Sequence, residues 1–151
     1  MYIHKKNGFT VLEAVVAIAI ISFVLVTSIT LLINIFNQNK AQQAQLNAIQ
    51  YATMIRDDIQ IDLLITEASS LVGEVPLDST NYASILSTLG ITSITINDAF
   101  NQASNPFYEK TVITFVNETF NSTLNLTIVN FTVQIEYYPN RTLEIEGVIY
   151  G

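Results

Sequence analysis

The sequence KKNGFTVLE at residues 5–13 leads directly into an apolar segment that ends at Phe36. Glu13 is the single ionisable side chain between Phe9 and Phe36. In a helical conformation, about 20 apolar residues suffice to cross the hydrocarbon core of a bilayer. The segment therefore predicts a membrane-spanning helix that begins near the N-terminus.

Two charged features distinguish this segment from a plain apolar helix. Lys5 and Lys6 stand immediately before it, and such a charge bias keeps the short N-terminus in the cytoplasm and places the remainder of the chain outside. Glu13 falls within the first turns of the apolar helix, where a carboxylate is costly unless it is protonated or paired with a cation. Glu13 is therefore a candidate functional residue that requires a cationic partner.

The residues from Gly8 to Glu13, followed by a run of Ala, Val, Ile and Leu, resemble the type IV prepilin signature. Pilins, type II secretion pseudopilins and competence pilins share this signature. The resemblance implies that a prepilin peptidase cleaves between Gly8 and Phe9 and methylates the new amine of Phe9. It also implies that Glu13 pairs with the Phe9 amine of a neighbouring subunit during filament assembly. Nothing beyond Gln38 is diagnostic of the family.

Two simpler interpretations of the N-terminus are a secretory signal peptide and a single-pass anchor. A signal peptide has an apolar core of about 7–15 residues followed by a small-residue cleavage site. This apolar run is longer, and no Ala-x-Ala site closes it. A plain anchor gives no reason for Glu13, so the prepilin interpretation is preferred.

Thr27, Ser28 and Thr30 stand where many pilins carry a proline at which the helix melts on assembly. Ser and Thr hydroxyls can hydrogen-bond to carbonyls of the preceding helical turn. These bonds leave the backbone hydrogen bonds of the helix intact. Whether the helix melts near Thr30 stays open.

The composition excludes several classes of function. The chain has 151 residues and no cysteine, which indicates one membrane-anchored domain without the disulfide-closed loop of many major pilins. Loss of residues 1–8 would leave four basic residues against thirteen acidic ones, so no nucleic-acid partner is expected. Neither His nor Cys occurs after residue 8, which removes the common nucleophile–histidine pairs. No enzymatic activity, cofactor or metal site is predicted.

The helix is expected to continue beyond the membrane to about Val72 and to end at Gly73 and Pro76. Apolar residues at spacings of three or four form one stripe along this second half, which comprises Ala41, Ala44, Ala48, Ala52, Ile55, Ile59 and Leu63. An amphipathic helix of this kind needs a partner layer over its stripe.

The remaining residues predict a short helix and several strands. The short helix covers residues 82–89, with Asn81 as its cap and Gly90 at its end. Strands are expected at residues 91–97 and 111–116 because both are rich in β-branched side chains.

Between residues 123 and 137 the apolar positions change from even to odd numbers, which predicts a β-bulge or break at Val129–Asn130. A turn at residues 138–141 and a last strand from Leu143 to Ile149 complete a hairpin. The expected fold class is α+β: a long N-terminal helical spine, transmembrane in its apolar half, packed through its amphipathic half on an antiparallel β-sheet, as in pilins.

Other polar groupings are weaker candidates. Asp57, Asp58 and Asp62 are expected to form a solvated helix face rather than a cation site, and Asp98 with its neighbouring asparagines is a weak calcium cue. Asn-x-Ser/Thr triplets begin at Asn117, Asn121, Asn125, Asn130 and Asn140. They fit either glycosylation or the polar face of exposed strands. Six aromatic residues could form an adhesive or subunit-contact surface, although most are expected in the core or on ordinary surface: Phe107, Tyr108, Phe120, Tyr137, Tyr138 and Tyr150.

Together these observations predict a structural subunit of a type IV pilus-like filament. Its parts would be a leader peptide (1–8), a transmembrane and filament-core helix (9–36) and a globular pilin head (37–151). Expected partners are copies of itself and other pilins, prepilin peptidase, the inner-membrane assembly platform and the membrane. The precursor is expected in the inner membrane, and the assembled subunit in an extracellular pilus or a periplasmic pseudopilus. The alternatives are a type II secretion pseudopilin and a single-pass membrane-anchored extracytoplasmic binding module.

Overall fold

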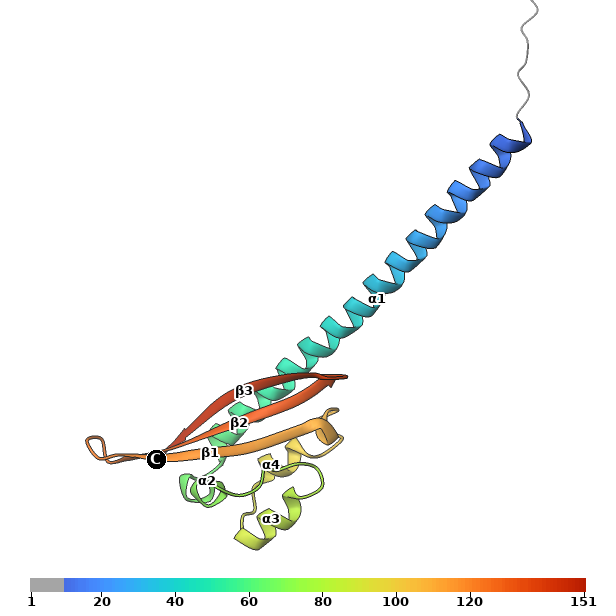
Figure 1. Ribbon diagram of the computed structural model, residues 1–151. Helices are drawn as coiled ribbons and strands as arrows, with labels where there is room; N and C mark the ends of the chain where they lie inside the picture. The colour runs from blue at the N-terminus through green and yellow to red at the C-terminus, as the bar shows by residue number, and fades with distance from the viewer. Residues whose placement is uncertain (1–9) are drawn as a thin grey trace, which may run out of the picture. The chain divides into compact units, whose positions relative to one another are not determined.

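The computed structural model describes residues 10–151, which form two compact units divided after Lys40 (Figure 1). Helix α1 (Val11–Asp62) extends through the end of the first unit into the second. The second unit, residues 41–151, is called the C-terminal unit below. It contains the rest of α1 and the following elements: α2 (Ile65–Leu71), α3 (Tyr82–Leu89), α4 (Ile94–Ala99), a 3₁₀ turn η1 (Tyr108–Lys110), β1 (Thr111–Asn121), β2 (Leu126–Tyr138) and β3 (Arg141–Tyr150).

The first unit consists of α1 up to Lys40, and its apolar side chains are exposed. The exposed fraction of the large apolar side chains ranges from 83% at Val11 to 50% at Val16. None of the most apolar stretch of this helix is buried. Among the described residues, α1 is the one helix long and apolar enough to cross a membrane.

Hydroxyl side chains in this unit bond back to the preceding turn, as expected. Thr27 Oγ1 donates to the carbonyl of Phe23 at 3.0 Å, and Thr30 Oγ1 donates to the carbonyl of Val26 at 2.9 Å. The helix is continuous through this region. These bonds satisfy the hydroxyls without removing backbone hydrogen bonds from the helix.

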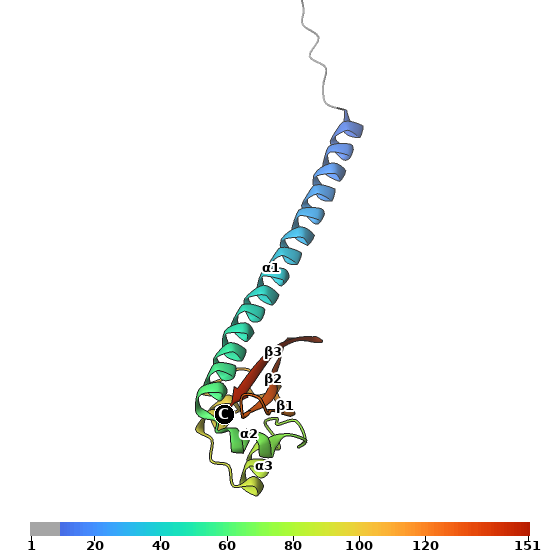
Figure 2. The same ribbon diagram turned by 90° about the vertical axis from the view of Figure 1, so that its left-hand side faces the viewer.

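The C-terminal unit confirms the predicted α+β class. Its sheet has three antiparallel strands in the order β1-β2-β3, and the last turns of α1 pack against it (Figures 1 and 2). The predicted stripe is buried at its centre, and the odd-numbered positions of β2 from Val129 to Ile135 are fully buried. These core residues are Ala48, Ala52, Ile55, Ile59, Val129, Phe131, Val133 and Ile135.

Gly147 on β3 lies directly opposite Phe131 on β2. A Cβ atom at Gly147 would overlap the Phe131 ring and would lie 2.9 Å from Cγ of Arg56 on α1. The absence of a side chain therefore lets the aromatic ring and the stem of Arg56 lie between helix and sheet.

The prediction of one helix to about Val72 is wrong. Helix α1 ends at Asp62, and Leu64 adopts an extended conformation (φ −68°, ψ 145°) before α2 begins. The Glu67 carboxylate accepts a hydrogen bond from the Leu64 amide at 3.3 Å, which stabilises the new helix start. The break turns α2 so that Ala68 and Leu71 are buried. This burial depends on tertiary packing, and no Gly or Pro at the break indicates it in the sequence. The second helical segment does end at Val72, next to Gly73, where φ is +86°.

The strand predicted at residues 91–97 is also wrong, because Ile94–Ala99 is helix α4. Ser93 caps this helix by accepting a hydrogen bond from the Ile96 amide at 3.3 Å. Ile96 and Ala99 are buried at helical spacing. Burial on one helical face overrides the strand preference of the β-branched residues.

Helix α3 and its end at Gly90, in the left-handed conformation, are confirmed. Asn81 does not cap it through its side chain. Its Oδ1 accepts from the amide of Asp78 at 2.8 Å, and Asp78 Oδ1 in turn accepts from the amides of Thr80 and Asn81 at 2.8 and 3.0 Å. This reciprocal pair fixes the loop that precedes α3.

The predicted break at Val129–Asn130 is wrong in its strand. Strand β2 buries its odd-numbered residues from Val129 to Ile135 without interruption, while Leu126 and Ile128 are only half-buried on the other face. The register shift lies across the ladder in β1, where Val116 is the extra residue between Phe115 and Asn117. The turn at 139–140 and the last strand are confirmed.

One polar residue in the core was not singled out by its sequence. The Asn105 side chain is fully buried, and its Nδ2 donates to the carbonyl of Ala99 and to Oγ1 of Thr111, each at 2.8 Å. Its Oδ1 accepts from the Phe107 amide at 2.9 Å. Asn105 thereby holds the connection between α4 and β1.

Candidate functional site

The candidate site is the beginning of α1, where Thr10 and Glu13 bond to each other. Thr10 Oγ1 accepts a hydrogen bond from the Glu13 amide at 3.3 Å. The Glu13 carboxylate accepts from the Thr10 amide at 3.4 Å and from the Thr10 hydroxyl at 3.5 Å. This reciprocal arrangement is a capping box, with Thr10 as the N-cap and Glu13 at the third helical position.

The capping box gives Glu13 a structural role that the membrane argument alone did not identify. The spacing Thr-x-x-Glu ahead of an apolar run is typical of a helix start, so residues 10–13 themselves indicate a capping box. The carboxylate also stands near the positive end of the helix dipole, which favours a negative charge there. Both Thr10 and Glu13 are exposed, so the carboxylate stays accessible to a second partner.

The surface that follows Glu13 is apolar and contains small residues. Ala14 and Ala17 are half-buried between larger exposed side chains. Small residues at such positions permit close approach of helices where lipid removes the hydrophobic driving force between them. One carboxylate therefore stands at the entrance of an otherwise uncharged helical surface.

The other predicted site residues, Gly8 and Phe9, lie outside the described residues, as do Lys5 and Lys6. Cleavage, methylation and the pairing of the Phe9 amine with Glu13 therefore stay predictions.

The aspartates near the end of α1 have protein partners of their own. Asp57 forms an ion pair with Arg56 at 2.6 Å, and Asp62 accepts a hydrogen bond from the Thr95 hydroxyl at 3.0 Å. Partial burial raises the pKa of Asp58, with further contributions from the carboxylates of Asp62, Asp57 and Asp98. Within residues 10–151, no group of three or more His, Cys, Asp or Glu side chains is arranged to hold a metal ion.

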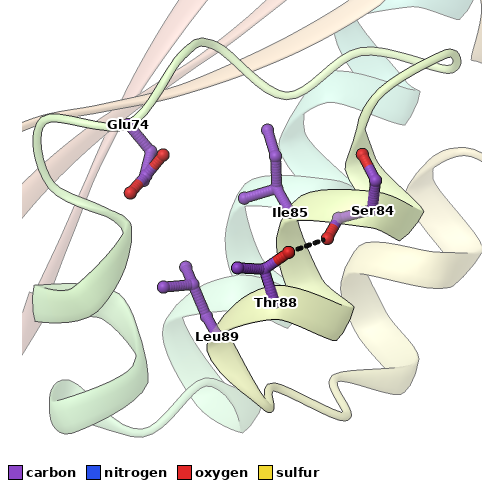
Figure 3. A pocket seen from close by; sticks show the side chains of 5 residues that line it. All are labelled: Glu74, Ser84, Ile85, Thr88 and Leu89. Atoms are coloured by element: carbon purple, nitrogen blue, oxygen red, sulfur yellow. Dashed lines mark hydrogen bonds between the residues drawn. The ribbon is translucent and has the colours of Figure 1, made fainter.

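A hollow of about 140 Å³ lies between α3 and the loop that carries Glu74 (Figure 3). Its walls are Ile85 and Leu89, and Thr88 Oγ1 donates to the carbonyl of Ser84 at 2.8 Å. Glu74 is its single ionisable lining residue. The hydroxyls of Ser84 and Thr88 also line the hollow, but each donates to a backbone carbonyl of α3 or its start rather than to Glu74.

The six aromatic candidates do not form one surface. Phe107 packs edge-on against Tyr51, with ring centroids 5.9 Å apart. Phe120 and Tyr150 are exposed by 61% and 71%, but they pair with the consecutive residues Thr127 and Ile128 of β2 and so lie on opposite faces of the sheet. Arg141 lies over the ring of Tyr138 at 5.8 Å.

A helix that opens with a capped glutamate and an apolar, exposed face, followed by an α+β unit, gives the described residues a pilin-like architecture. Residues 3–29 match the family model of the prokaryotic N-terminal methylation motif, which is the signature of type IV prepilins and pseudopilins. The chain therefore carries the N-terminal prepilin signature, and the match does not extend into the C-terminal unit. No curated protein and no solved structure matches the chain.

Proposed function

We propose that this chain is a structural subunit of a type IV pilus-like filament. The observation that carries the proposal is the solitary carboxylate of Glu13 at the entrance of an exposed apolar helix, within the matched motif. Removal of residues 1–8 would create an amine at Phe9, next to the capping box. In the membrane this amine and Glu13 are the charges that most need partners.

Pairing between the Phe9 amine of one subunit and Glu13 of its neighbour would satisfy both charges. A carboxylate that is costly in lipid would then help to set the axial register of helices in the filament core. The small residues Ala14, Ala17 and Ala19 would allow these helices to approach closely.

The proposed parts are the leader (1–8), the membrane and filament-core helix (9–36) and the head (37–151). The partners are other copies and other pilins, prepilin peptidase, and the assembly platform of the inner membrane. The precursor resides in the inner membrane with its N-terminus in the cytoplasm, and the head lies outside. Assembly places the subunit in an extracellular filament.

The experiment is intact-mass measurement and N-terminal sequencing of the protein from its native membrane. The expected result is a chain that starts at N-methylphenylalanine 9. Replacement of Gly8 by Leu is expected to leave the full-length chain, because a bulky side chain blocks cleavage. An unprocessed wild-type chain in cells that contain the peptidase would refute the proposal and favour a membrane-anchored binding module. Recovery of the processed subunit in sheared extracellular filaments, rather than in the periplasm, separates a pilus from a secretion pseudopilus.

A further inference from the structure

The asparagines of this chain are unevenly distributed with respect to Asn-x-Ser/Thr triplets. All five asparagines after residue 110 begin such a triplet, and none of the nine before it does. The five lie in the sheet or its turns, and none of them is buried. We propose that the sheet is N-glycosylated and that Asn121, at the tip of the β1–β2 hairpin, is the principal acceptor.

The hydrogen bonds of Asn121 are made by its side-chain oxygen and leave its amide nitrogen available. Its Oδ1 accepts hydrogen bonds from the amides of Thr123 and Leu124, at 3.0 and 3.2 Å. These bonds fix the orientation of the side-chain amide, and within residues 10–151 no hydrogen bond is made by its Nδ2. Ser122, Thr123 and Leu124 are all exposed, so a transferase can reach the triplet.

A polar strand face accounts for only part of the pattern. It explains Asn130 and Thr132, which alternate with buried residues of β2. Asn121, Asn125 and Asn140 stand instead at strand ends and turns, where Gly, Asp or Ser would serve the backbone equally well. At each of these three positions a threonine follows two residues later, which the turn itself does not require.

The hairpin tip also exposes apolar side chains close to the triplet. Phe120, immediately before Asn121, is 61% exposed, and Leu124 is 69% exposed. Exposed apolar side chains clustered at one place indicate a contact surface.

Asn130 serves as an internal control within the same sheet. It lies on the central strand and is half-buried, as Asn121 is, but its Nδ2 donates to Oδ1 of Asn117 at 2.7 Å. Its amide nitrogen is therefore occupied, and it is expected to stay unmodified.

The reaction requires a glycan carried on a polyprenyl diphosphate. A bond forms between Asn121 Nδ2 and the anomeric carbon, the bond from that carbon to the phosphate oxygen breaks, and the amide loses one proton. Polyprenyl diphosphate is the leaving group. Because this donor acts at the outer face of the membrane, the inference rests on the proposed orientation of the subunit.

The test is glycopeptide and intact-mass analysis of the full chain from its native membrane. Wild type is expected to carry a glycan on Asn121 and none on Asn130. Thr123→Ala is expected to remove the mass of one glycan, whereas Thr123→Ser, which keeps the triplet, retains it. Thr132→Ala, at the control site, is expected to remove none. Because Thr123 is exposed, its substitution leaves the core intact.

The outcomes separate this inference from the proposed function. A chain that starts at methylated Phe9 but carries no glycan on Asn121 overturns the inference and leaves the filament proposal standing. A glycan on Asn130 in place of Asn121 overturns the site assignment. A chain that starts at Met1 refutes prepilin processing, and a glycan on Asn121 of that same chain still supports modification of the sheet.

Discussion

Glu13 combines a structural and a proposed electrostatic role in one side chain. As the third residue of the capping box it accepts from the Thr10 amide, and a neutral glutamine could do the same. As the proposed partner of a neighbouring Phe9 amine it must be charged. The two roles therefore respond differently to loss of the charge and to loss of the cap.

Glu13→Gln and Thr10→Ala separate these roles. Glu13→Gln keeps an acceptor for the Thr10 amide but removes the charge, so filament yield is expected to fall at least tenfold at normal membrane levels of subunit. Thr10→Ala removes the N-cap hydroxyl, which costs about 1 kcal/mol of helix stability, but keeps the charge. Its filament yield is expected to stay within about twofold of wild type, because the bilayer stabilises the helix even without the cap.

Filament yield by shearing and immunoblotting, normalised to the processed subunit in the membrane, provides the measurement. Thr10→Ser keeps both cap and charge and is the matched control. Full assembly of Glu13→Gln, together with failure of Thr10→Ala, would show that capping is the dominant role of this pair.

At the scale of elements, the sequence predicted the features that follow from periodic apolar residues. It did not predict the helix boundaries that depend on tertiary packing. The stripe on α1 was found because Ala48, Ala52, Ile55 and Ile59 recur at helical spacing and are all buried. The break after Asp62 was missed because Leu64 is a poor capping residue and signals no boundary.

Helix α4 and the β1 bulge were missed for related reasons. Ile and Thr favour strands, and the Ser93 cap was outweighed in that window. The change of phase near Asn130 does not mark a bulge in β2, because Leu126 and Ile128 lie half-buried on its other face, and the bulge in β1 is a separate feature. At the candidate site, the cost of a charge in lipid indicates Glu13 as a functional residue, but it does not indicate the hydrogen bonds between Glu13 and Thr10.

The Asp78 loop yields a prediction with a defined pH dependence. Hydrogen bonds from the Thr80 hydroxyl and amide, and then from the Asn81 amide, lower the pKa of Asp78 below its ordinary value of 3.8. Since the folded pKa is lowered, the carboxylate stabilises the fold fully above pH 3.8, and this contribution is lost as the pH falls through the lowered pKa.

Hydrogen exchange at the backbone amides of Thr80 and Asn81 measures the contribution of the Asp78 carboxylate, using the full chain in detergent. In wild type their protection is expected to fall below pH 4, after correction for the intrinsic exchange rate. Asp78→Asn keeps an oxygen acceptor and is expected to show weaker protection without this pH dependence. Equal pH profiles in the two proteins would exclude Asp78 as the titrating group.

At the scale of the whole molecule, the buried core and the exposed apolar surface belong to different parts of the sequence. Every buried apolar residue of the described chain lies between Ala48 and Ile149. The apolar side chains before Lys40 are exposed and contribute nothing to that core. The C-terminal unit also carries an excess of acidic residues, with three basic side chains against twelve acidic ones, which favours solubility.

We therefore expect residues 41–151, produced without the N-terminal segment, to be soluble without detergent and to unfold cooperatively. The matched control is a fragment of residues 53–151, which lacks the buried Ala48 and Ala52 and the Tyr51 ring that packs on Phe107. Loss of these contacts is expected to lower the melting temperature by several degrees or more, because about 1 kcal/mol shifts the midpoint of a domain of this size by about 4–8 °C. Circular dichroism and sedimentation velocity of both fragments provide the measurement. Aggregation of the 41–151 fragment would show that the C-terminal unit depends on the membrane helix for its fold, and equal midpoints would show that the α1 stripe before residue 53 adds no stability.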